Sequence, residues 1–233
     1  MKKVLTFSLW GNIPKYMVGA IKNAELAKKF YPSFECWFYI HKETVPKDVV
    51  DNLSKLSNTK IIFKTGELLT SKPMCWRFEA IDDDNVEVMM ARDTDTRIFL
   101  REKLAVDEWL KSDKVLHIMR DNYFNHRHKI FGGMFGIKKI KLLNMMSIIN
   151  TVNQNNQSRN YDLYVLNKLL EKIDKNSIMI HSPYNIFPNE IVNDFPIHYS
   201  ADNYNFVGCY IYEDDSRREK DHTQLKEKYI ANK

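Results

Sequence analysis

The chain has 233 residues, of which 44% are hydrophobic and 28% charged, which suits one sizeable folded domain. Its formal charge of +5 is mild, and no basic block is interleaved with aromatic residues, which argues against a nucleic-acid-binding protein. Only seven glycines and seven prolines argue against long disordered or fibrous segments.

The first half of the chain alternates between strand and helix patterns. Residues 3–10 predict a buried strand, and a helix follows whose apolar positions recur between Tyr16 and Phe30. Strands at 34–40 and 60–63 come next, separated by a short polar helix. This β-α-β-α-β order predicts parallel strands with helices packed against them.

The second half continues less regularly, with an apolar run at 86–91 that is typical of a central parallel strand. The pattern further predicts helices near 73–80, 104–110, 140–149 and 161–174, an extended segment at 130–137, strands at 177–180 and 206–212, a polar loop at 151–160 and a charged peripheral tail at 213–233. No repeat or domain boundary is evident. We therefore expect one domain over 1–233, with a nucleotide-binding half over about 1–97 and an acceptor half over about 98–212.

Three cysteines and the N-terminus bear on the cellular compartment. Cys36, Cys75 and Cys209 form no CxxC pair and lie beside apolar residues, which predicts free buried thiols in a reducing compartment. The N-terminal apolar run is too short for a signal peptide and lacks a small-residue cleavage site. No stretch approaches the roughly 18 apolar residues of a membrane span. We expect a cytoplasmic protein without a transmembrane segment.

The most informative feature is the acid pair Asp93 and Asp95, directly after the strand at 86–91. In open α/β sheets, ligands bind outside the carboxyl ends of the strands. Two carboxylates there suit Mn²⁺ or Mg²⁺, which also bind diphosphate oxygens. Such a metal would neutralise the charge on a leaving nucleoside diphosphate. The alternative is an ordinary Asx turn that caps the following helix.

Several segments resemble, in order and spacing, a group of GT-A glycosyltransferases found in bacteria and large DNA viruses. They are Met74–Arg77, VEVMMARDTDTR, REKLAVDEWL, HIMRD and FGGMFG, spanning about 74–137. The resemblance covers most of the chain and thins after residue 175. It implies a single GT-A (Rossmann-like) α/β domain whose mostly parallel central sheet is flanked by helices. It also implies a metal-dependent glycosyltransferase that moves a sugar from a UDP-sugar to a glycan or glycoconjugate acceptor, with retention of configuration.

The resemblance, with the chemistry of the residues, assigns roles to individual positions. The metal would be bound by Asp93 and Asp95, with His198 as a candidate third ligand, and the donor by Ser8, Leu9, Trp10, Tyr16, Arg77 and Arg92. Contacts with the sugar or acceptor would come from His126, Gly132 and Gly133, and catalytic roles from Asp121 and Asp162. Asp162 keeps the acid of a Tyr-x-x-Asp-Gln motif in related enzymes, but Leu163 replaces its glutamine. Asp121 or Asp162 could also serve as the base of an inverting enzyme.

Two other classes of function stay open on the sequence. A haloacid-dehalogenase-type phosphatase also places DxDx(T/V) after an apolar strand, with Arg97 here at the Thr/Val position and residues 213–215 as a second acidic motif. A non-catalytic nucleotide-sugar-binding protein is the third reading. A zinc site at His117, His126 and His128 lacks matching Cys or Glu spacing.

Overall fold

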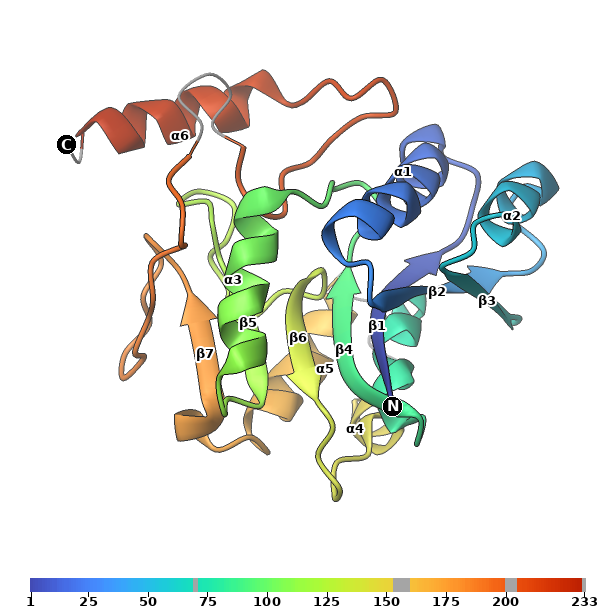
Figure 1. Ribbon diagram of the computed structural model, residues 1–233, viewed down its shortest axis with the longest axis horizontal. Helices are drawn as coiled ribbons and strands as arrows, with labels where there is room; N and C mark the ends of the chain where they lie inside the picture. Colours follow the sequence, from blue (N-terminus) through green and yellow to red (C-terminus); the bar gives the residue numbers. More distant parts are fainter. Residues whose placement is uncertain (69–70, 153–159, 200–204, 232–233) are drawn as a thin grey trace.

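The computed structural model describes residues 1–68, 71–152, 160–199 and 205–231. One seven-stranded sheet, in the order β3-β2-β1-β4-β6-β5-β7, forms the centre of the molecule (Figure 1). The strands are β1 (Lys2–Leu9), β2 (Phe34–His41), β3 (Thr59–Lys64), β4 (Val86–Arg92), β5 (Leu116–Met119), β6 (Met134–Lys138) and β7 (Ile178–His181). The helices are α1 (Pro14–Phe30), α2 (Lys47–Ser54), α3 (Leu100–Lys111), α4 (Met145–Thr151), α5 (Tyr161–Leu170) and α6 (Glu219–Ala231), with 3₁₀ segments η1 (Lys72–Asp82) and η2 (Lys175–Ser177).

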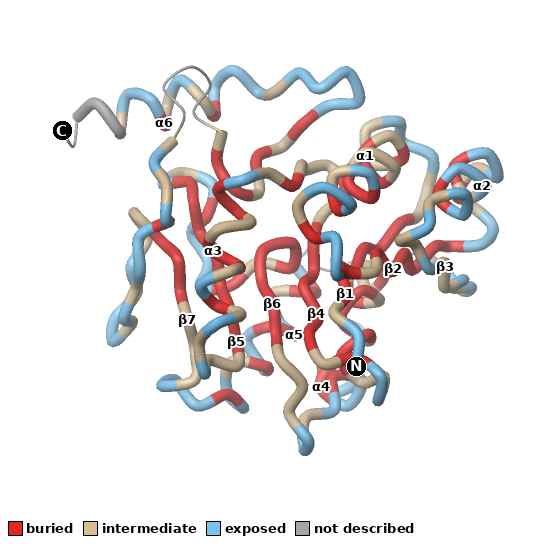
Figure 2. The backbone as a smooth tube through the Cα atoms, in the orientation of Figure 1, coloured by how far each residue is buried: buried red, intermediate tan, exposed pale blue. Residues whose placement is uncertain are grey.

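Helices cover both faces of this sheet, so the central strands are buried between two apolar layers (Figure 2). Alternate side chains of β4 enter opposite layers: Met89 packs towards η1, α4 and α5, and Met90 packs towards α1 and α3. Burial on both faces explains why β4 reads as a continuous apolar run. The predicted α/β fold with a mostly parallel sheet is confirmed.

Strand β6 is the exception to the parallel order, because it runs antiparallel to both β4 and β5. Its register sets Met134 opposite Arg92, the last residue of β4. The start of β6 therefore lies at the edge of the sheet where β4 ends. This reversal brings the glycine pair before β6 to the acid pair after β4.

Several predicted elements differ in the structure. Residues 206–212 do not form a sheet strand, and in this segment Ile211 makes one isolated bridge, with Arg217. Gly208 has a positive φ of 79°, which breaks an extended run. The predicted helix at 140–149 begins only at Met145, where the Asp82 carboxylate accepts the first amide at 2.7 Å.

The C-terminal tail also differs from the prediction, since much of it is the helix α6. Leu225 of α6 packs with Phe206 and Cys209 in a small separate apolar cluster. All three cysteines are free and buried, as the sequence predicts. Of the predicted loop at 151–160, residues 153–159 lie outside the described residues. No helix in the described part of the chain has both the length and the apolar character needed to cross a membrane.

Candidate active site at the carboxyl end of β4

The loop that carries the acid pair is fixed from behind by α1. The buried Asn23 side chain donates to the main-chain carbonyls of Thr94 and Thr96 at 3.4 and 2.8 Å. The Arg97 guanidinium donates to the Thr96 carbonyl at 2.9 Å. A methyl group on Gly19 would overlap the Thr94 carbonyl, so only glycine lets α1 approach this closely. The loop is therefore held rigidly before any ligand binds.

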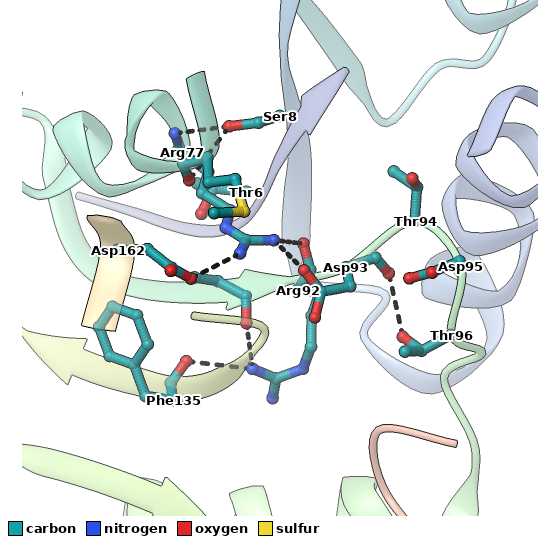
Figure 3. A network of polar contacts seen from close by, with 12 residues as sticks. Thr6, Ser8, Arg77, Arg92, Asp93, Thr94, Asp95, Thr96, Phe135 and Asp162 are labelled. Carbon is teal, nitrogen blue, oxygen red and sulfur yellow. Dashed lines mark hydrogen bonds and ion pairs between the residues drawn. The ribbon is translucent and has the colours of Figure 1, made fainter. Parts of the chain in front are cut away.

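The acids do not cap the next helix. Helix α3 begins at Leu100, and its N-cap residue Phe99 makes no side-chain cap. Inside the loop, the Thr96 hydroxyl donates to the Asp93 carbonyl at 3.0 Å (Figure 3). The Asp93 and Asp95 carboxylates are thus free of the capping role that the alternative reading gave them.

Arg77 is the centre of the polar network in Figure 3. Its guanidinium forms an ion pair with Asp93 and donates to the Arg92 carbonyl at 2.9 Å. The Asp162 carboxylate, in the first turn of α5, lies 4.0 Å from the Arg77 Nη2 atom. The Arg77 amide donates to the Ser8 hydroxyl at 3.1 Å, which ties η1 to the end of β1. One buried cation therefore joins three elements around the acids.

The two glycines before β6 make room for this network. A methyl group on Gly133 would overlap the Asp93 carboxylate. One on Gly132 would overlap the Asp162 carboxylate and would lie 2.7 Å from Arg77 Nη2. Side-chain-free positions are thus needed for both acids to keep their places. The structure brings the pair Gly132–Gly133 next to Asp93 and Asp162.

The carboxylates differ in how far solvent reaches them. The Asp93 side chain is 42% exposed and that of Asp95 only 17%. Burial raises the pKa of Asp95, and the neighbouring Asp93 charge adds to this while Lys15 opposes it. Burial also raises the pKa of Asp162, against the opposing charge of Arg77. Three carboxylates therefore meet at this strand end, beside the cations of Arg77 and Lys15.

Lys15 is a site residue that the sequence analysis missed. Its Nζ atom lies 3.3 Å from Asp95 Oδ2 and over the rings of Tyr16 and Tyr210, at 4.2 and 4.0 Å from their centroids. Burial would lower the pKa of Lys15, but these three contacts raise it above its usual value. The Ile211 amide donates to the Asp95 carbonyl at 2.8 Å, so the C-terminal segment reaches the site as well.

Aromatic rings line the adjoining ends of β1 and β2. Trp76 stacks on His41 with centroids 6.1 Å apart and meets Trp10 edge-on at 6.4 Å. His41 is held by the Thr44 hydroxyl and the Gly66 carbonyl, both at 2.9 Å. Trp10 was predicted here, whereas Trp76 and His41 were not. Trp76 sits within the run Met74–Arg77, where it could have been singled out as the neighbour of Arg77.

Two residues that were predicted to bind the donor, Arg92 and Leu9, point away from the site. Arg92 is 2% exposed, and its guanidinium pairs with Glu102 at 2.7 Å and donates to the Phe135 carbonyl at 3.1 Å. It stabilises the packing of α3 on the sheet instead of facing a ligand. Leu9 is 1% exposed and belongs to the apolar layer under α1.

Asp121, a predicted catalytic residue, is fully buried, and both of its carboxylate oxygens accept hydrogen bonds from the protein. Arg101 binds both of its oxygens, at 2.8 and 2.7 Å. The Tyr199 hydroxyl donates to Oδ1 at 2.7 Å and the Val207 amide donates to Oδ2 at 2.8 Å. With 0% exposure, this carboxylate cannot meet a substrate. The catalytic assignment of Asp121 is replaced by a structural one.

The predicted histidines are likewise outside the site. His126 Nδ1 accepts the amides of Asp121 and Asn122 at 2.8 and 3.0 Å, and burial lowers its pKa to about 3. His198 is exposed. Among the described residues no three His, Cys, Asp or Glu side chains gather as a metal site, so neither a third ligand nor a zinc site is formed there. His117 bonds to His181 at 2.8 Å instead.

The phosphatase reading finds no support in the geometry either. Its second acidic motif, residues 213–215, is exposed at the surface. There Asp215 pairs with Lys22 and with Arg97, at 2.5 and 3.1 Å. Asp215 thus contacts α1 and Arg97, while Asp93 pairs with Arg77 and Asp95 with Lys15.

Comparison with known proteins identifies the fold. No protein-family model matches this chain, and no curated protein sequence matches it. Among solved structures, the galactosyltransferase LgtC in complex with donor and acceptor sugar analogues superposes with a TM-score of 0.50 and 12% identity, over 77% of this chain and 73% of that one. The fold is GT-A. Other GT-A matches are a glycosyltransferase involved in the glycosylation of the major capsid of PBCV-1 (TM-score 0.46, 17% identity, 83% and 82% covered) and 4-diphosphocytidyl-2C-methyl-D-erythritol synthase from Anaerococcus prevotii (0.49, 13%, 79% and 89%).

The glycine pair of this candidate site gives a direct test of its geometry. We expect Gly133→Ala to lower turnover by about 100-fold, because the new methyl group displaces Asp93. It should also lower the melting temperature. In an Asp93→Ala background that loss of melting temperature should largely disappear, since the overlapping carboxylate is gone. An alanine variant with normal turnover would show that Asp93 does not need its present position.

Proposed function

We propose that the chain is a metal-dependent glycosyltransferase that moves a sugar from a UDP-sugar to a glycan or other hydroxyl acceptor. The observation that carries the proposal is the group of three acids at the carboxyl end of a central strand, with Asp93 and Asp162 around Arg77 and Asp95 beside Lys15. A bound diphosphate needs cations at this place, and the sugar beside it needs oxygen atoms that accept hydrogen bonds from its hydroxyls. The described cluster offers both.

The acid pair fits a bound Mn²⁺ or Mg²⁺. Asp93 and Asp95 supply hard oxygen ligands, and the Asp93 Oδ2 atom has no hydrogen-bond partner among the described residues. The GT-A likeness adds an expectation of a divalent ion, which would supply Lewis-acid stabilisation of the leaving diphosphate. With two protein carboxylates, the remaining ligand positions would fall to the diphosphate and water.

The aromatic rings at the ends of β1 and β2 suit the nucleoside. Trp10 and Trp76 are partly exposed beside the diphosphate end, whereas His41 beneath them is buried. Aromatic faces stack on flat bases for about 1–3 kcal/mol per base. Tyr16, another aromatic residue predicted to bind the donor, lies against Lys15 and so would be nearer the diphosphate than the base.

The sugar would then lie against the surface that Gly132–Gly133 and Asp162 form together, since these residues are already in close contact. Transfer passes through an oxocarbenium-like state, which a nearby carboxylate stabilises. Asp162 can also accept hydrogen bonds from the sugar hydroxyls. Asp121 is buried and so unavailable as a base, and Asp162 is assigned to the sugar in this arrangement. We therefore favour retention of configuration, in which the leaving phosphate takes the acceptor proton.

Calorimetry with UDP, GDP and ADP, each with Mn²⁺ and with EDTA, tests the donor assignment. We expect UDP to bind most tightly and only with Mn²⁺. Product analysis with UDP-sugars should then show UDP and free or transferred sugar. Equal affinity for all three nucleotides would remove the uridine assignment. Release of UTP from UDP-sugar and pyrophosphate would instead identify a nucleotidyltransferase.

The role of Asp162 is tested by Asp162→Asn. We expect turnover to fall by ~100-fold or more, the scale of a lost positioned catalytic group, while UDP affinity barely changes. Glu171→Gln, in an exposed residue just after the same helix, is the matched control and should be neutral. Lost UDP binding in Asp162→Asn would move this residue into the nucleotide pocket.

A further inference from the structure

The role of Lys15 depends on the balance of charges around it. In the structure Asp93, Asp95 and Asp162 contribute three negative charges, and Arg77 and Lys15 contribute two positive ones. Each acid of the pair after β4 therefore already has one protein cation. A divalent ion at this pair would add positive charge to a site whose charges are nearly balanced. A bound diphosphate would offset that added charge with its own negative charge.

The two cations differ in their freedom to move. The Arg77 guanidinium is buried and its Nη1 atom binds the Arg92 carbonyl and Asp93 together, which fixes its plane. The Lys15 ammonium ends a flexible side chain, and among the described residues its one carboxylate partner is Asp95 at 3.3 Å. Its other contacts are the faces of two tyrosine rings. Rotation of the lysine side chain can release Asp95 without moving the backbone.

We propose that Lys15 is a resident counter-cation that competes with the metal for Asp95 and moves to the donor's diphosphate when metal and nucleotide bind together. This rests on the proposed function and assigns Lys15 as a further donor-binding residue. The physical reason is that an ammonium and a divalent cation on one carboxylate repel each other. The diphosphate offers the ammonium a new anionic partner within the same acidic cluster.

Tyr210 is the positioning residue for this exchange. Its ring covers the ammonium at 4.0 Å, and the Arg218 guanidinium lies 4.7 Å from the centroid of the same ring. The next residue, Ile211, is tied to the Asp95 carbonyl by its amide. The C-terminal segment therefore confines the lysine to the space between Asp95 and the diphosphate position.

The test separates metal binding from nucleotide binding by calorimetry with MnCl₂ alone and with UDP at saturating MnCl₂. For Lys15→Met we expect opposite changes. Mn²⁺ alone should bind about tenfold more tightly, because its competitor is gone. UDP with Mn²⁺ should bind about tenfold more weakly, because a charge-assisted contact is lost. Lys28→Met, in an exposed residue of the same helix, is the matched control and should change neither affinity.

The outcomes distinguish this inference from the proposed function. If the wild type binds UDP with Mn²⁺ but Lys15→Met leaves both affinities unchanged, or shifts both in the same direction, the exchange is overturned. If the wild type binds no UDP at all, the proposed function fails instead, and tighter Mn²⁺ binding by Lys15→Met still supports the competition. Lys15→Gln, which keeps a long polar side chain, repeats the test if the methionine variant does not fold.

Discussion

Replacing Asp95 by asparagine is expected to reduce transfer by at least about 1,000-fold, to the detection limit, because the change removes one of two carboxylates proposed to bind the metal. The fold should survive. The loop backbone is held by Asn23, Arg97 and Ile211 through main-chain carbonyls, none of which depends on the Asp95 side chain. Lys15 loses a partner but keeps its contacts with two aromatic rings.

Transfer assays with Mn²⁺ and with EDTA, together with thermal melting, check this expectation. The control is Asp84→Asn, because that side chain is fully exposed and far from the loop's hydrogen bonds. EDTA should abolish wild-type activity and added Mn²⁺ should restore it. Full activity in chelator, or full activity of the Asp95 variant, would remove the metal from the mechanism.

Asp121→Ala is expected to destabilise the protein by about 3–5 kcal/mol, the cost of leaving one member of a buried ion pair without its partner. Arg101 would keep a buried charge, and the Val207 amide and Tyr199 hydroxyl would lose their acceptor. These partners come from α3 and from two C-terminal segments. The carboxylate therefore holds together parts of the chain that are distant in sequence.

Urea denaturation measures this loss as a lower midpoint, with Asp162→Ala as the comparison. Asp162 makes one 4.0 Å ion pair and bonds to its own helix, so its removal should cost far less. A variant of Asp121 with wild-type stability and strongly reduced turnover would contradict the structural role and return Asp121 to the catalytic set.

The sequence predicted the fold and the position of the acid pair because both follow from local pattern. An apolar run that ends abruptly in acids marks a central strand with polar residues at its carboxyl end. The glycine pair was assigned from the resemblance to GT-A glycosyltransferases. By contrast, nothing local distinguishes Asp93, which is open to solvent, from Asp121, which is buried against Arg101.

Long-range placement accounts for the other differences. Lys15 reads as an ordinary residue at a helix start until α1 sets it beside Asp95. Arg92 lies next to the acid pair in sequence, but the alternation of side chains along β4 turns its guanidinium to the other face of the sheet, where it pairs with Glu102. Residues 205–212 donate main-chain hydrogen bonds to Asp95 and Asp121. These are tertiary contacts, which leave no periodic pattern in the sequence.

The reversed strand β6 also has a consequence for the growing polypeptide. Strand β4 is complete once Arg92 has been made, yet one of its two hydrogen-bonding edges waits for Met134–Lys138. Strand β5 cannot take that place, because in the sheet it pairs with β6 and β7 and never with β4. During synthesis the apolar run VEVMMA therefore has one unpaired edge until residues 93–133 and then β6 have been made. Unpaired apolar edges are where newly made chains associate with one another. The strand that follows the glycine pair of the candidate site is thus also the one that covers the open edge of β4.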